Sequence, residues 1–94
     1  MDIRKEDGEK HGRYVVDING IEAEMTYSRM SATAIIVDHT GVPDALAGQG
    51  VGKALVAHLI QDATDTGFKI VPLCPFVKAQ YAGHPEWKPV MMGR

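Results

Sequence analysis

The stretch Leu46-Ala47-Gly48-Gln49-Gly50-Val51-Gly52-Lys53 places three glycines immediately before a helical pattern. An apolar run, Ala34-Ile35-Ile36-Val37, lies just upstream, so the order is strand, glycine loop, helix. Glycines let the backbone turn tightly and leave its N–H groups uncovered. A helix N-terminus adds unpaired N–H donors and a partial positive charge. Together these features predict a site for a phosphate or pyrophosphate.

The spacing of the glycines narrows the choice of ligand. The loop lacks the Gly-Lys-Ser/Thr ending of a nucleotide-binding P-loop, because Ala54 follows Lys53. It also lacks the dinucleotide fingerprint Gly-x-Gly-x-x-Gly, because its glycines stand at positions 48, 50 and 52. The expected ligand is a small phosphorylated cofactor of another kind. A plain helix entry is the alternative that this motif alone leaves open.

Four strands are expected before the glycine loop. Asn19-Gly20 is a strong hairpin signal, because both turn positions tolerate a positive φ. After this turn, apolar and polar residues alternate in part, which predicts a strand with one buried and one wetter face. The expected strands are Ile3 to Asp7, Tyr14 to Ile18, Ile21 to Arg29 and Thr33 to Thr40, with a loop over Gly8–Gly12 and a turn over Met30–Ala32.

Two helices and a fifth strand are expected after the loop. An apolar stripe at helical spacing predicts the first helix, and Gly67 stands where a helix commonly ends. The intervening helix makes the fifth strand parallel to the fourth. The expected elements are a helix from about Gly50 to Thr66, a strand from Lys69 to Leu73, a helix from Pro75 through Tyr81 and a turn over His84–Trp87. The order ββββαβα predicts an α+β fold with helices packed on a mixed sheet.

Length and composition set limits on function. With 94 residues, of which 45% are hydrophobic and 23% charged, the chain is expected to form one domain over 1–94. A net charge of −2 gives no electrostatic case for binding nucleic acid. The single cysteine, Cys74, rules out an internal disulfide and fits a reducing compartment. No apolar run is long enough to span a bilayer and no signal peptide is evident, so a cytoplasmic location is expected.

Three separated motifs carry a resemblance to a known family. They are the glycine loop, the segment His39-Thr40-Gly41-Val42-Pro43 before it, and Pro72-Leu73-Cys74-Pro75-Phe76-Val77 with His84-Pro85-Glu86-Trp87 after it. In this order they resemble the Gcn5-related N-acetyltransferases (GNAT superfamily), and within it the small single-domain YjdJ-type subfamily. The resemblance covers the chain from about Ile3 to Trp87.

The resemblance implies acetyl-CoA as the cofactor and a sheet that splays apart between its fourth and fifth strands. Backbone groups from Ile36 to His39 would pair with the pantetheine arm, and backbone N–H groups from Ala47 to Lys53 would hold the pyrophosphate. The cofactor-binding residues so expected are Val37, Asp38, Ala47, Gly48, Gln49, Gly50, Val51, Gly52 and Lys53. No metal is required, because a helix N-terminus can hold the pyrophosphate.

Acetyl transfer to an amine needs a neutral nucleophile and a stabilised carbonyl oxygen. Cys74 is a candidate nucleophile for a two-step route, and His39 is a candidate general base. Each has an ordinary structural reading: Cys74 as a small buried apolar residue and His39 as a cap of the loop. Tyr81 and His84 are weaker candidates, for which packing and a helix-end role are favoured.

The chain departs from the family pattern at Ala47, Gly41 and Gln80, where relatives usually carry Arg or Gln, Glu, and an aromatic residue. The favoured hypothesis is an N-acetyltransferase acting on a primary amine of a small molecule or a protein. The alternatives are a non-catalytic CoA-binding module and an interaction protein whose glycine loop is structural. A monomer or weak homodimer is expected, since a sheet edge could remain open to a partner.

Overall fold

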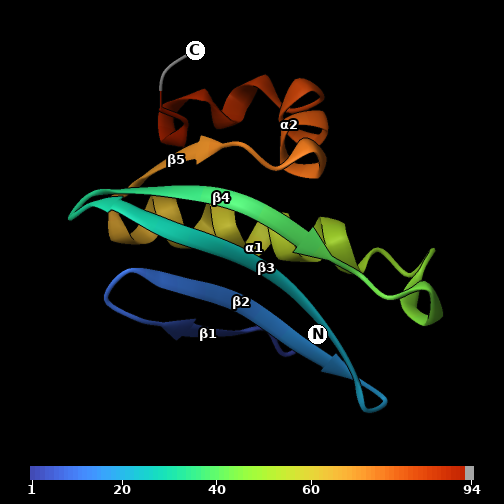
Figure 1. Cartoon of the computed structure of the whole chain (residues 1–94). Coiled ribbons are helices and arrows are strands. Elements are labelled where there is room, and N and C mark those ends of the chain that lie inside the picture. Colours follow the sequence, from blue (N-terminus) through green and yellow to red (C-terminus); the bar gives the residue numbers. More distant parts are fainter. Residues whose placement is uncertain (93–94) are drawn as a thin grey trace.

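The computed structural model describes residues 1–92 and contains one five-stranded sheet with the strand order β1-β2-β3-β4-β5 (Figure 1). Strands β1 to β4 are antiparallel and β5 runs parallel to β4, as the sequence predicts. The elements are β1 (Arg4–Asp7), β2 (His11–Ile18), β3 (Ile21–Ser31), β4 (Ala34–Gly41), the 3₁₀ helix η1 (Asp44–Leu46), α1 (Val51–Thr66), β5 (Lys69–Pro72), α2 (Pro75–Ala82) and the 3₁₀ helix η2 (Pro85–Val90).

The predicted turn signals explain the sharp ends of the elements. Asn19 and Gly20 both have positive φ, 53° and 80°, and they join β2 to β3 as a hairpin. Gly67 ends α1 in the left-handed region (φ 91°), and its N–H donates to the carbonyl of Ala63. Pro75 occupies the first turn of α2, where its missing N–H costs no hydrogen bond.

Four predicted loops or turns were wrong in extent or type. His11 and Gly12 belong to β2, not to a loop, because they pair with β3. Strand β3 continues through Met30 and Ser31, and the turn lies at Ala32 and Thr33. The expected loop before the glycines contains η1, and the expected turn over His84–Trp87 opens the longer η2, which also takes in part of the tail.

One face of the sheet carries the core. Helix α1 lies behind β3 and β4 in Figure 1, and its apolar stripe packs against the inward side chains of the strands. The fully buried large side chains of this core are Tyr14, Val16, Met25, Tyr27, Val37, Val51, Leu55, Val56, Leu59, Ile70 and Val77. No helix stands in front of β1 to β4 in this view, and that outer face is largely polar. On the outer face, Arg13 pairs with three glutamates.

Strand β5 accompanies only the first half of β4. The two strands pair from Ala34 to Val37, and the carbonyl of Val37 accepts the last two bonds, from the N–H groups of Leu73 and Cys74 (3.1 and 2.9 Å). A β-bulge at Asp38 then shifts the register of β4 against β3. Beyond this point β4 runs toward the glycine loop while β5 turns into α2, so the strands diverge (Figure 1). The predicted splay between the fourth and fifth strands is confirmed.

Candidate phosphate-loop site

The glycine loop forms a tight left-handed entry into α1. Gly48 and Gly50 have φ of 79° and 74°, a conformation that residues with a β-carbon rarely adopt. No atom lies within 4 Å of a β-carbon built on either glycine, so both open onto free space. The loop therefore presents bare backbone, which is what close approach of a phosphate requires.

The N-terminus of α1 leaves its donors uncapped by side chains. Gly50 is the N-cap and has no side chain to accept a hydrogen bond, and the first helical bond runs from Ala54 N–H to the Gly50 carbonyl (3.0 Å). The N–H groups of the first turn thus have no intrahelical acceptor. The first turn contains no acidic residue, and Lys53 is exposed in it. The charge and the free donors at this helix end both favour an anion.

An open pocket of about 530 Å³ lies against this helix end. Six of the seven loop residues predicted to bind the cofactor line it; the exception is Gln49, whose side-chain amide donates to the Ala45 carbonyl (3.4 Å). The lining residues are Val42, Leu46, Ala47, Gly48, Gly50, Val51, Gly52, Lys53 and Phe76. Sequence reasoning did not assign Val42, Leu46 and Phe76 to the site. No local signal in the sequence places Phe76 near the loop, because its ring reaches the pocket through the contact of α2 with α1.

The two β4 residues predicted to pair with the cofactor differ in which of their groups remain accessible to a ligand. The side chain of Val37 is fully buried, and its carbonyl is already engaged by β5. Asp38 is exposed in the bulge, where its carboxylate accepts from the hydroxyls of Thr26 (2.6 Å) and Ser28 (3.2 Å). Strand pairing with a ligand therefore has room only from Asp38 onward.

The structure does not bring the two catalytic candidates together. Cys74 is 3% exposed and belongs to the core, and its Sγ lies 3.3 Å from the hydroxyl of Thr40. Thr40 pairs with the buried Met25, while His39 pairs with Thr26 on the outer face. Successive strand residues point to opposite faces, so His39 and Cys74 lie on different sides of the sheet. A base acting directly on the thiol is absent from this arrangement of the described residues.

The two weaker candidates have structural surroundings. His84 stacks on Trp87 with ring centroids 4.2 Å apart, and its Nδ1 lies 2.8 Å from a carboxylate oxygen of Glu86. This hydrogen bond holds the pKa of Glu86 below its ordinary value. Tyr81 is half-buried against the core. These arrangements agree with the roles favoured from the sequence, which are packing for Tyr81 and a helix-end role for His84, the N-cap of η2.

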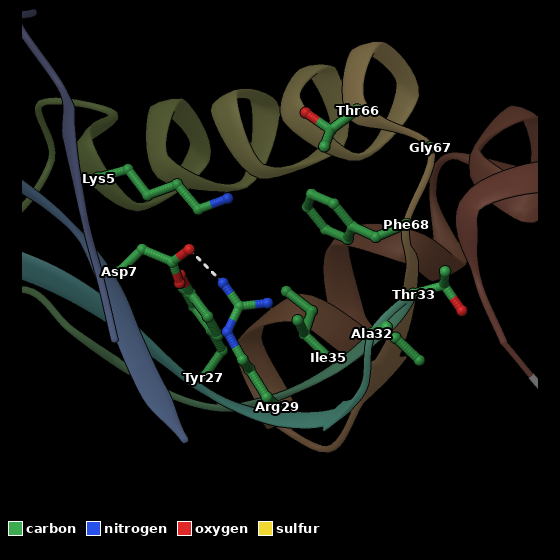
Figure 2. Close-up of a pocket in the computed structure, with 11 residues that line it drawn as sticks. Lys5, Asp7, Tyr27, Arg29, Ala32, Thr33, Ile35, Thr66, Gly67 and Phe68 are labelled. Carbon is green, nitrogen blue, oxygen red and sulfur yellow. Dashed lines mark hydrogen bonds and ion pairs between the residues drawn. The ribbon is translucent and has the colours of Figure 1, made fainter. Parts of the chain in front are cut away.

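A second, smaller cavity of about 150 Å³ lies at the other end of α1 (Figure 2). Lys5, Arg29 and Phe68 point toward its interior, and Thr66 and Gly67 at the end of α1 close one side. Asp7 accepts from the Tyr27 hydroxyl and pairs with Arg29. These partners, with the Tyr27 hydrogen bond foremost, lower the pKa of Asp7, and burial opposes them.

Asp62, on α1, does not line this cavity but holds two residues that do, Lys5 and Thr66. Lys5 Nζ and the Tyr14 hydroxyl each donate to one carboxylate oxygen of Asp62 (2.7 Å), and the Thr66 hydroxyl donates to the other (3.1 Å). Burial raises the pKa of Asp62, but these hydrogen bonds and the Lys5 charge outweigh it and lower the pKa overall. Burial and Asp62 together raise the pKa of the Tyr14 hydroxyl.

Two further features bear on ligands and location. Within residues 1–92, no three His, Cys, Asp or Glu side chains are grouped so as to hold a metal ion. None of the helices in the described part of the chain is both long and apolar enough to cross a membrane.

Comparisons with known proteins identify the family. A model of the GCN5-related N-acetyltransferase family matches residues 13–90. The NMR solution structure of a GCN5-like N-acetyltransferase candidate from Staphylococcus aureus is similar, with a TM-score of 0.70 and 34% sequence identity over 99% of this chain and 89% of that one. No curated protein matches the chain. The chain belongs to the GCN5-related N-acetyltransferase family; the YjdJ-type subfamily remains a prediction.

Proposed function

We propose that this protein binds acetyl-CoA at the glycine loop and transfers the acetyl group to a primary amine. The observation that carries the proposal is the pocket at the α1 N-terminus, where bare glycine backbone, uncapped N–H groups and Lys53 face the same space. A pyrophosphate needs donors and positive charge, and this pocket offers both without a metal. Membership of the family supports the same ligand.

The remaining parts of the ligand would follow the divergence of β4 and β5. From the loop, the pantetheine arm would run along β4 beyond Val37, where β5 no longer pairs with it. The acyl end would then approach Thr40 and Cys74, whose polar atoms lie 3.3 Å apart. Bound there, acetyl-CoA supplies an activated thioester: the amine nitrogen bonds to the acetyl carbon, the carbon–sulfur bond breaks, and the proton lost from nitrogen ends on the CoA sulfur.

Two routes use the residues of this chain differently. In direct transfer, Thr40 and Cys74 only border the reacting carbonyl. In the two-step route, Cys74 Sγ takes the acetyl group as CoA thiol leaves, and the amine then displaces the cysteine. Cys74→Ala distinguishes them: retained turnover excludes the acetyl-cysteine route, and loss of turnover with CoA binding intact supports it.

A non-catalytic CoA-binding module is the second candidate. The observation that favours it is the position of His39, which lies on the face opposite Cys74 and leaves the thiol without an adjacent base. The experiment that separates the two candidates has two stages. Calorimetric titration with acetyl-CoA and with CoA tests binding, and amine-dependent release of CoA thiol tests transfer. Binding without amine-dependent release selects the module; no binding of either ligand overturns both candidates.

A further inference from the structure

The pocket at the glycine loop has one aromatic wall that the phosphate chemistry does not use. Phe76 lies in the first turn of α2, and its ring packs across the first turn of α1. A β-carbon built on Gly52 would lie 2.8 Å from Cζ and 3.1 Å from Cε2 of this ring. The ring remains 36% exposed and lines the pocket. The missing side chain of Gly52 therefore lets the tip of the ring approach the helix end closely.

We propose that the Phe76 ring is the contact surface for the pantetheine arm, and that Gly52 positions the ring for it. The inference rests on the proposed function, since it assigns one part of CoA to one part of the same pocket. Phe76 follows Cys74 by two residues, in the first turn of α2, and its ring lines the same pocket as the glycine loop. A pantetheine chain that leaves a phosphate held on the loop would start in this pocket, which the ring lines.

The lining of the pocket supports this assignment. The glycine backbone and Lys53 suit an anion. Phe76, Val42 and Leu46 offer no charge and no side-chain hydrogen bond. The phosphates of CoA match the first group of lining residues. The uncharged pantetheine chain, with its methyl and methylene groups, matches the second group, because burying those groups against an exposed ring removes apolar surface from water.

Fragments of CoA test the assignment directly. Phe76→Ala is expected to weaken the binding of CoA and of 4′-phosphopantetheine by roughly tenfold, as for an aromatic contact at the centre of a site. It should leave the affinity for 3′,5′-ADP, which lacks the pantetheine arm, unchanged. Leu73→Ala is the matched control. Leu73 is 54% exposed and lies between β5 and α2, three residues before Phe76, but it does not line the pocket. Its loss should therefore leave the affinities for CoA, for 4′-phosphopantetheine and for 3′,5′-ADP unchanged.

The role of Gly52 is tested by a double-mutant cycle. Gly52→Ala should weaken CoA binding by displacing the ring, because Gly52 has an ordinary helical backbone in which alanine is otherwise favoured. In a Phe76→Ala background the same change should have no effect on affinity, since the ring is gone. This non-additivity is the signature of a contact between the two residues.

The outcomes separate failure of this inference from failure of the proposed function. If the native chain binds neither CoA nor 4′-phosphopantetheine, both are overturned. If the native chain binds CoA but Phe76→Ala binds it equally well, or loses 3′,5′-ADP affinity to the same extent, only the role of Phe76 is overturned. Should Phe76→Ala fail to fold, judged by circular dichroism, Phe76→Leu is measured in its place. It keeps an apolar side chain but removes the flat ring, and the same criteria apply.

Discussion

The two ends of α1 hold pockets of opposite character. Sixteen helical residues, about 24 Å, separate the glycine loop from the cavity around Lys5, Asp7 and Arg29. The cavity has more charged side chains and is the more enclosed, yet both Asp7 and Asp62 already accept from neighbours with each carboxylate oxygen. The glycine loop has a single charged side chain, and its donors lack side-chain caps. Unmet hydrogen-bonding capacity, not charge density, marks the end suited to a ligand.

The largest expected effect removes the bare backbone of the loop. Gly50→Val places a branched side chain at φ 74° in the wall of the pocket, so we expect at least two charge-assisted hydrogen bonds to the pyrophosphate to be lost. At about 1.5 kcal/mol each, this weakens CoA binding by about a hundredfold, as measured by calorimetry. Gly20→Val introduces the same strain at φ 80° in the β2–β3 hairpin. It should lower the stability of the fold without weakening the binding of CoA. Equal losses of affinity in both variants would contradict the assignment of the loop.

The next effect falls on the charged cavity and concerns stability. A β-carbon on Gly12 would lie 2.3 Å from the Tyr27 hydroxyl and 2.9 Å from the backbone carbonyl of Glu6. Gly12→Ala must therefore move the ring that donates to Asp7, and we expect a loss of about 2 kcal/mol in the free energy of unfolding. Urea titration measures it. Unchanged stability would show that the Tyr27–Asp7 contact is dispensable, and CoA affinity should remain native because the other end of α1 is untouched.

A smaller effect is expected from two carboxylates in and beside the charged cavity as the pH changes. The pKa values of Asp7 and Asp62 lie below the ordinary 3.8, so both groups stabilise the fold at neutral pH. That stabilisation is present above the unfolded-state pKa and is lost as the pH falls through the folded-state values, below about pH 4. Asp62→Asn should cost about 1.5 kcal/mol at pH 7 and flatten the loss of stability in acid. Asp65 is exposed on the same helix, so Asp65→Asn should change neither the stability at pH 7 nor the loss of stability in acid. If the stability of the two variants depends on pH in the same way, the role of Asp62 is contradicted.

The smallest expected effect concerns the single charge of the loop. Lys53→Met removes a positive charge beside the pocket, and because the side chain is exposed we expect CoA to bind only about threefold more weakly at low salt. The difference should fade as the salt concentration rises. Lys78→Met makes the same charge change on α2, outside the pocket lining, and serves as the control. A much larger effect at Lys53 would mean that the side chain, and not the backbone, dominates anion binding.

Much of the fold could be predicted because its decisive signals are local. Asn19-Gly20 fixes a hairpin through its own φ preferences, and the stripe on α1 fixes which face of the helix is buried. The boundary at Gly12 could not be predicted, because a glycine in a strand makes sense only once Tyr27 is known to lie over it. The same holds for the site: the loop donors follow from local sequence, whereas the ring of Phe76 reaches the pocket through the packing of α2 on α1.

The charged cavity has a consequence for the open edge of the sheet. Strand β1 places Lys5 and Asp7 on its inner side, where an edge strand would ordinarily carry apolar residues, and Arg4 and Glu6 on its outer side. The four residues of β1 therefore offer an extra strand at this edge no apolar side chain to cover. The added strand would also have to desolvate four ionised side chains, which is costly even when they are paired. The features that fill this end of the core with charge thus guard the chain against edge-to-edge aggregation.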